Sequence, residues 1–388
     1  MNKWKRMEEE LRTLQENHLY RRIKVIESPQ KSHVRYQGRD MLMLASNSYL
    51  DLCDEECIKT YAADVLREYG TGSGGSRLTT GTTVLHTKLE ERLAQFKGRE
   101  AAVVFNTGFA ANSGIIPALC KKGDIIYSDE KNHASIIDGC RQSAAETVIY
   151  RHNDMEDLEK KILEHPLKSG LIVSDGVFSM DGDIVNLPVL VKLADTYGLL
   201  SMIDEAHATG VIGDSGRGCE EYFHMEGKTD ILMGTLSKAI GAEGGYVCGP
   251  RVLTEYLKNK ARSYIFSTSP APVTMAAAER ALKLIEEEPW RVRRLQENTR
   301  WFCEKLKEHG ISASSESAIV PIRIGDEEKA VRVSERLMEF GYFIPAIRYP
   351  TVKKGEAMLR AALMATHTKE ELAAAAYAVS SAMNSCGL

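Results

Sequence analysis

The side chains best suited to chemistry form an acidic pair followed by a histidine, Asp204-Glu205-Ala206-His207, directly after an apolar run at 199–203. The same letters, DEAH, form the magnesium-holding box of nucleic-acid helicases. They also place an Asp three residues before a His, outside any metal motif. The first question is therefore whether the Asp204 carboxylate meets a metal ion or another group.

A helicase would need a second motif, the loop GxxxxGK[ST], whose amides cradle phosphates and whose lysine reaches them. The sequence has no such loop, because the glycine-rich stretch at 70–77 contains no lysine and follows a helical pattern rather than a buried strand. A net charge of −4 also leaves no basic surface for neutralising many phosphates. A nucleotide-driven nucleic-acid enzyme is thus a remote alternative, and we expect no nucleic-acid partner.

A lysine among small residues, Lys238 in the segment TLSKAIG, follows the next buried run. As a nucleophile it would form a Schiff base with a carbonyl, and the hydroxyls of Thr235 and Ser237 could serve a phosphate. Pyridoxal 5'-phosphate (PLP) combines an aldehyde, a phosphate and a ring nitrogen that a neighbouring carboxylate keeps protonated. Asp204 is the candidate for that carboxylate, and His207 could reach the ring hydroxyl.

Several further motifs extend this pattern along nearly the whole chain, and together they resemble the α-oxoamine synthase family of fold-type I PLP enzymes. Besides DEAH and the lysine segment they are GTGSGGSRLTTG at 70–81, NHAS at 132–135, GVFSMDGD at 176–183, GVIGDSGRG at 210–218, STS at 267–269 and AIRYPTV at 346–352. A single motif would be weak evidence, but this many in the same order are highly specific.

The resemblance implies four catalytic residues. Lys238 would hold the cofactor and remove the substrate Cα proton, and Asp204 would pair with the protonated ring nitrogen. His133 would stack on the ring and help to protonate reacting groups, while His207 and Ser179 would hydrogen-bond the ring oxygen. Each has a structural alternative, such as a helix cap for Asp204 or a structural histidine for His133.

The resemblance also implies how the cofactor phosphate is held. Gly108 and Phe109 precede an apolar helix whose free amides could bind a phosphate, as helix N-termini do. Thr235 would add a hydroxyl. Ser267 and Thr268 would reach the phosphate of a partner subunit, because the family forms homodimers with shared active sites.

For the substrates, Arg360 matches the family's arginine that holds the amino-acid carboxylate as a bidentate pair. Arg21 and Thr351 match positions that contact the acyl thioester, and Asn47 and His133 complete the substrate-binding set. The register of Arg21 is ambiguous within the run RR at 21–22.

The sequence departs from the family in two places. The stretch SNSYLDL at 46–52 resembles the family's SNDYLGL but has Ser48 and Asp51 where Asp and Gly are usual. Phe109 stands where a Tyr is frequent, so that ring packing is kept and a hydroxyl is lost.

The family's reaction is a decarboxylative Claisen condensation, in which an amino acid and an acyl thioester give an α-amino ketone, a thiol and carbon dioxide. Two substrate pairs stay open. L-Alanine with a pimeloyl thioester of coenzyme A or a carrier protein, a step of biotin biosynthesis, is favoured by GSGGSR and AIRYPTV. Glycine with acetyl-CoA is favoured by NHASIIDG at 132–139.

The elements that must position these residues are short apolar runs of strand length with helical patterns between most of them. The runs lie at 101–105, 124–127, 148–150, 171–174, 199–204, 231–234 and 246–248. Strands that are apolar throughout are buried on both faces, so we expect an α/β fold with a mostly parallel seven-stranded sheet flanked by helices. In such sheets ligands collect at the carboxyl ends of the strands, where the motifs begin.

Beyond this sheet, 251–310 reads as helix with a break at 269–272 and then one long charged helix. A second alternation follows, with strands at 319–324, 342–347 and 358–364 and helices at 327–340 and from 369. We expect an N-terminal arm at 1–45 packed against both domains, a large PLP-binding domain at 46–290 and a small C-terminal α/β domain at 291–388.

The eight cysteines are scattered, and no second pair or histidine cluster joins Cys53 and Cys57 to make a metal site. We expect reduced thiols and no metal. The N-terminal segment is amphipathic without the apolar run of a signal peptide, and no segment approaches a membrane span. These features predict a cytoplasmic protein without a membrane partner.

Overall fold

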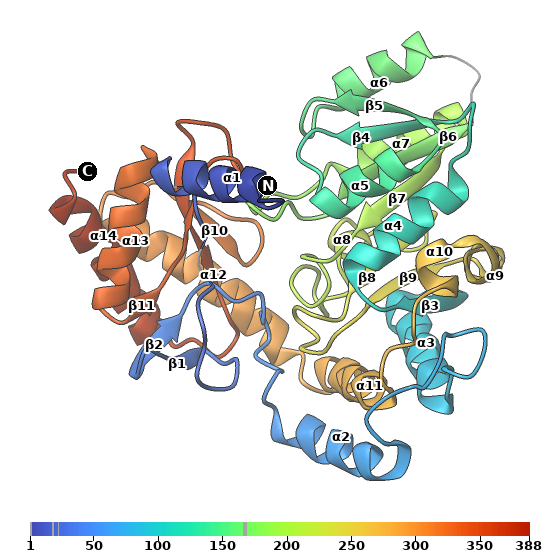
Figure 1. Cartoon of the computed structure of the whole chain (residues 1–388), viewed down its shortest axis with the longest axis horizontal. Helices are drawn as coiled ribbons and strands as arrows, with labels where there is room; N and C mark the ends of the chain where they lie inside the picture. The colour runs from blue at the N-terminus through green and yellow to red at the C-terminus, as the bar shows by residue number, and fades with distance from the viewer. Residues whose placement is uncertain (1, 18, 22, 166–168) are drawn as a thin grey trace.

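The computed structural model describes residues 2–17, 19–21, 23–165 and 169–388, which form two lobes (Figure 1). The lobes are joined by α11 (Pro272–Glu287), α12 (Trp290–Glu308) and the chain between β2 (Arg39–Met43) and α2 (Glu56–Tyr69). A seven-stranded sheet forms the core of the larger lobe. Across the sheet its strands are β3 (Ala101–Phe105), β9 (Gly245–Gly249), β8 (Ile231–Thr235), β7 (Leu200–Asp204), β6 (Gly170–Asp175), β4 (Ile125–Asp129) and β5 (Glu146–Tyr150).

Only β9 runs antiparallel to its neighbours in this sheet, so the predicted α/β fold with a mostly parallel seven-stranded sheet is confirmed. The register pairs Asp175 with Asp204, and Asp204 with Met233. Because parallel strands end at the same edge, the polar residues that close β4, β6, β7 and β8 lie side by side.

In the strands other than the edge strand β5, alternate residues enter two separate apolar cores, one on each face of the sheet. In β7, for example, Met202 belongs to one core and Ile203 to the other. This explains why the strands read as continuous apolar runs. The helices of this lobe are α2 (Glu56–Tyr69), α3 (Val84–Lys97), α4 (Gly108–Leu119), α5 (Ala134–Gln142), α6 (Met155–Glu164), α7 (Leu187–Tyr197), α8 (Cys219–Tyr222), α9 (Arg251–Lys260), α10 (Arg262–Ile265) and α11 (Pro272–Glu287).

The smaller lobe is built on an antiparallel sheet in the order β10, β13, β12. Its elements are β10 (Ile319–Gly325), β12 (Ala346–Ile347), β13 (Ala357–Ala362), α12 (Trp290–Glu308), α13 (Glu327–Glu339) and α14 (Lys369–Ser385). Helices α12 and α13 pack on this sheet, and α14 packs on both of these helices.

Two sequence predictions in this lobe are wrong, both at a proline. The expected strand at 342–347 is two short strands in different sheets, β11 (Tyr342–Phe343) and β12, because Pro345 cannot donate to a strand ladder. The expected single helix after 272 is divided into α11 and α12 at Glu288-Pro289, since proline removes a helical hydrogen bond.

The N-terminal segment contributes α1 (Lys5–Glu16), β1 (His33–Tyr36) and β2 (Arg39–Met43). Helix α1 has no buried residue, whereas β2 pairs with β1 and, in parallel, with β11 of the smaller lobe. The division of the chain at 45 and 290 stays a prediction.

All eight cysteines are free thiols. Among the described residues, no group of His, Cys, Asp and Glu side chains could hold a metal ion. Within the same part of the chain, no helix is long and apolar enough to cross a membrane.

Candidate active site

The carboxylate of Asp204 lies at the end of β7, buried to 3% exposure. Its Oδ1 accepts a hydrogen bond from the Ala206 N–H at 2.9 Å, and its Oδ2 accepts one from Asn112 Nδ2 at 2.8 Å. The remaining acceptor Oδ1 of Asn112 is buried and has no hydrogen-bond partner among the described residues. The surroundings of Asp204 therefore keep polar capacity for a bound group.

Lys238 follows β8 on the neighbouring strand end. Burial lowers the pKa of its amine to about 8, although Asp204 and Asp175 act in the opposite direction. The Lys238 amine forms no hydrogen bond or ion pair with any residue that the structure describes. A lysine with a lowered pKa and a free amine is suited to attack a carbonyl.

His133 caps the N-terminus of α5 beside these groups. Its backbone N–H donates to Asp175 Oδ2 at 2.8 Å, and its Nδ1 lies 2.8 Å from Ser135 Oγ, which also accepts from Asn112 Nδ2. Burial lowers the pKa of His133, with Lys238 acting in the same direction and Asp204 against it. His133 thus shares a hydrogen-bond network with the Asn112 that holds Asp204.

His207 belongs to the same turn as Asp204, and its Nδ1 lies 2.6 Å from the Tyr49 hydroxyl. Burial lowers the pKa of His207 well below its usual range, and the nearby charge of Lys238 adds to this, so the ring is held neutral. Burial also raises the pKa of Tyr49 to about 12. The pair is therefore an uncharged hydrogen bond at the edge of the site.

Arg360, from β13, links the smaller lobe to this group. Its Nε donates to the Ser179 carbonyl at 2.6 Å, and its Nη2 donates to Asn47 Oδ1 at 3.1 Å. The structure thus brings three predicted site residues together from distant parts of the chain. Of the five N–H donors of a guanidinium, three remain for a ligand.

The predicted phosphate site lies where α4 begins. A Cβ added to Gly108 would meet the side chain of Thr235 at 3.3 Å, so the helix N-terminus lies directly against that residue. Thr235 Oγ1 is 2.8 Å from Ser237 Oγ. The Phe109 side chain is 46% exposed and does not pack into the site within one chain.

Ser267 and Thr268 lie on an outer surface of the larger lobe, where Thr268 is exposed and Ser267 half-buried. The Thr268 carbonyl accepts a hydrogen bond from Asn106 Nδ2 at 2.6 Å, which ties this segment to the loop before α4. Their hydroxyls form no hydrogen bond with a described residue. Both hydroxyls are therefore free to bind a group outside this chain.

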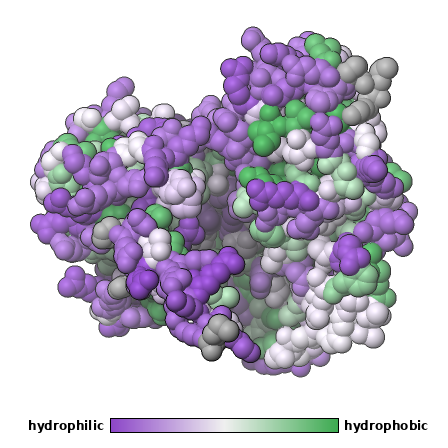
Figure 2. Space-filling view, turned by 45° about the horizontal axis from the view of Figure 1, so that its top comes forward, coloured by the Kyte–Doolittle hydropathy of each residue, from purple (hydrophilic) through white to green (hydrophobic). Residues whose placement is uncertain are grey.

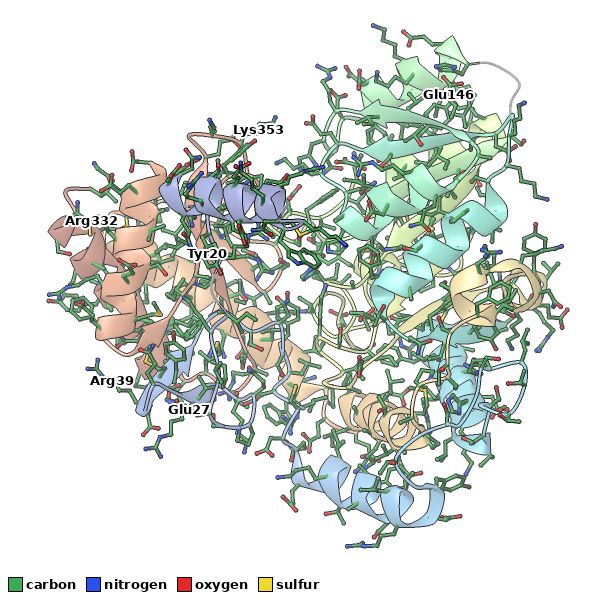
Figure 3. All side chains as sticks on the ribbon, in the orientation of Figure 1. Tyr20, Glu27, Arg39, Glu146, Arg332 and Lys353 are labelled. Atoms are coloured by element: carbon green, nitrogen blue, oxygen red, sulfur yellow. The ribbon has the colours of Figure 1, made fainter. Side chains whose placement is uncertain are left out.

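Arg21 and Thr351 line one groove of about 530 Å³, away from Lys238, together with Lys24 and Arg348. Thr351 also lines a cleft of about 710 Å³ that reaches Ser179 between the lobes. Figure 2 shows a hollow between the lobes. In the view of Figure 3, Lys353 of the cleft lies above α1 and Tyr20 of the groove below it. Both Arg21 and Thr351 are exposed.

Sequence reasoning missed Asn112, Tyr49 and Asp175. Asp175 carried a signal, because it closes the strand next to that of Asp204. Burial raises the pKa of Asp175 well above its usual range, and Asp204 adds to this. Asn112 lies inside a helix and Tyr49 in a loop, so only the fold brings them to the site.

The donor set at these strand ends fits PLP. A free amine with a lowered pKa suits the aldehyde, the buried Asp204 suits a ring nitrogen, and the helix N-terminus at Gly108 with the Thr235 hydroxyl suits a phosphate.

The chain belongs to the aminotransferase class I and II family, whose model matches residues 39–379. It is 49% identical over 367 residues to 8-amino-7-oxononanoate synthase of Geobacter sulfurreducens, which covers 94% of both proteins. Identity to the enzyme of the same name from Symbiobacterium thermophilum is 47% over 367 residues, again 94% of both. A solved structure of a serine palmitoyltransferase variant from S. paucimobilis with a bound PLP–myriocin aldimine is similar, with a TM-score of 0.93 at 32% identity over 99% of this chain and 98% of that chain.

Within that family the protein is an α-oxoamine synthase of fold type I, a PLP-dependent acyltransferase. The resemblance inferred from the motifs is thereby confirmed, as is the expected cofactor. The helicase interpretation of DEAH no longer stands.

Proposed function

We propose that the protein condenses L-alanine with a pimeloyl thioester, of coenzyme A or a carrier protein, to 8-amino-7-oxononanoate with release of the thiol and carbon dioxide. This would be a step of biotin biosynthesis. The observation that supports it most strongly is the similarity to relatives of that name, 47% to 49% identical along 94% of the chain.

In this proposal Asp204 holds the ring nitrogen of PLP, and Gly108, Phe109 and Thr235 hold its phosphate through the amides that open α4 and a hydroxyl. His207 and Ser179 would face the ring oxygen. Bound there, PLP supplies a protonated ring that withdraws electrons from the substrate Cα. The buried Asp204 keeps that proton on the nitrogen, because an adjacent negative charge favours the cationic form.

Lys238 binds the cofactor and takes the Cα proton of the substrate. Its lowered pKa of about 8 leaves a usable share of the amine unprotonated near neutral pH. His133, whose pKa burial lowers, would hydrogen-bond or protonate the reacting groups. The two residues divide the proton transfers between them.

Arg360 binds the amino-acid carboxylate through the N–H donors that Ser179 and Asn47 leave free. Its two existing bonds orient the guanidinium, so less freedom is lost when the substrate binds. Arg21 and Thr351 would contact the acyl thioester in the groove that they line.

Ser267 and Thr268 would reach the phosphate in a second subunit of a homodimer. The exposure of Thr268 in the single chain supports this arrangement. Equilibrium sedimentation should then give a dimer, and Thr268→Ala should weaken PLP binding.

Measurement of thiol release with each of the two substrate pairs distinguishes the two possible reactions. L-Alanine with pimeloyl-CoA should give turnover and the mass of 8-amino-7-oxononanoate. Turnover with glycine and acetyl-CoA alone would replace this proposal with glycine C-acetyltransferase activity (2-amino-3-ketobutyrate CoA ligase), which the stretch at 132–139 favours.

A further inference from the structure

The second acid of the DEAH turn, Glu205, has no role in the proposed chemistry, yet it forms an ion pair that is closed to solvent. Its Oε2 lies 2.6 Å from Lys97 Nζ, and both side chains are 0% exposed. Lys97 is the last residue of α3, 108 positions away in the chain. Burial alone would lower the pKa of Lys97, but Glu205 raises that pKa above the usual lysine range, so the pair is charged.

Each polar group of this pair is engaged. Lys97 Nζ also donates to Thr209 Oγ1 at 2.9 Å and to the Arg217 carbonyl at 2.5 Å, which uses all three of its protons. Glu205 Oε1 accepts the Cys219 N–H at 2.7 Å. The pair therefore joins the end of α3 to the loop before α8.

Between these anchors lies the turn at 204–209. The main chain of Glu205 donates to the Met233 carbonyl at 2.7 Å, and its own carbonyl accepts from the N–H groups of Ala208 and Thr209 at 2.9 Å. Asp204 precedes this anchored residue, and His207 lies inside the turn. Movement of Glu205 would therefore displace both proposed cofactor contacts.

Stability alone is a weak explanation for such a pair. Replacing a buried ion pair by apolar side chains of similar size is often neutral or stabilising, because desolvation offsets the attraction. A fully bonded pair does, however, fix one arrangement of the segments that it joins. We therefore attribute the ion pair between Lys97 and Glu205 to the need to hold the turn at 204–209 in one conformation.

We propose that Lys97 and Glu205 are positioning residues that hold the DEAH turn so that Asp204 meets the ring nitrogen of PLP and His207 the ring oxygen. The inference rests on the proposed role of Asp204. Neither Lys97 nor Glu205 touches the cofactor or the substrates.

The test removes both charges together, in the variant Lys97→Met with Glu205→Leu, and measures three properties of the full chain. They are the thermal unfolding of the PLP-free protein, the dissociation constant of PLP by titration, and the pH dependence of the visible absorbance of the bound cofactor. We expect unfolding at a lower temperature than in the wild type, because the Cys219 N–H and the Arg217 carbonyl lose their buried partners. PLP binding should be about tenfold weaker, as when a group that orients a binding side chain is lost, and the absorbance titration should shift.

A neighbouring ion pair provides the matched control. Arg99 and Glu220 are also paired and mostly buried, and Glu220 accepts the N–H groups of Gly227 and Thr229 rather than any group of the turn at 204–209. Arg99→Met with Glu220→Gln should change unfolding but not the PLP dissociation constant.

Wild-type PLP affinity and absorbance titration in the Lys97/Glu205 double variant would overturn the inference. If that variant does not fold, Thr209→Val, which removes one acceptor of Lys97, should weaken PLP binding in the same direction, and unchanged binding there would also overturn it. Asp204→Asn separates the two proposals. If it too leaves the absorbance titration unchanged, the role assigned to Asp204 is wrong, whereas a changed titration with an inert ion pair overturns only this inference.

Discussion

The two ends of the active site are built differently. At the cofactor end, Asp204 and Thr235 close neighbouring strands, are buried, and belong to hydrogen-bond networks within the larger lobe. At the proposed acyl end, Arg21 and Thr351 are exposed on segments outside regular structure. A rigid sheet edge suits chemistry that every member of the family shares, and exposed segments suit the part of the substrate that differs.

Substitutions at the cofactor end should have the largest effects. Lys238→Ala should lower kcat by at least about 10⁴-fold, because it removes the base for the Cα proton as well as the attachment of PLP. Small primary amines in the buffer should restore part of the rate. Steady-state kinetics check this, and a loss of less than tenfold would show that another group is the base.

Arg360, where the lobes meet, should give an intermediate effect. Arg360→Lys keeps the charge but loses the planar fork, so the KM for the amino acid should rise by about tenfold or more while the KM for the acyl thioester changes little. Arg323→Lys on the adjacent strand is the matched control, since Arg323 pairs with Asp181 and is mostly exposed. Equal changes for both substrates would contradict the assigned role.

At the acyl end the effect should be smaller. Arg21→Ala should raise the KM for the acyl thioester by less than about tenfold and leave that for the amino acid unchanged, because exposed charge contacts contribute little. The exposed Arg35→Ala should change neither. A large loss of kcat in Arg21→Ala would remove the contrast between the two ends.

The last effect is on stability rather than turnover and concerns His152, which lines the cleft between the lobes. Burial opposes the charge of His152, but Asp129 and Asp183, at 3.1 and 2.9 Å, raise its pKa to about 9. Since the folded pKa lies above the usual value, this contribution to stability should be complete below about pH 6.5 and lost as the pH rises through about 9. Urea unfolding of wild type and His152→Gln at pH values across this range should show the difference shrinking, and a constant difference would contradict it.

Sequence alone predicted the sheet well, since apolar runs of strand length mark strands that are covered on both faces. The residues that follow those strands were predicted for the same reason. Contacts between distant segments could not be predicted in this way. Lys97, which pairs with Glu205, lies 108 positions away in the chain, and Tyr49 lies 158 positions before His207. Pro345 and Pro289 are visible in the sequence, but the apolar and helical patterns around them continue. Those patterns therefore do not show that the prolines interrupt a strand and a helix.

Lys238 follows the end of β8, where we expect it to bind PLP. Borohydride reduction of the purified protein, followed by proteolysis and mass spectrometry, tests it directly, because reduction makes the link between lysine and cofactor permanent. We expect the peptide that contains Lys238 to carry the mass of reduced PLP. Cofactor on another lysine, with the Lys238 peptide unmodified, would contradict it.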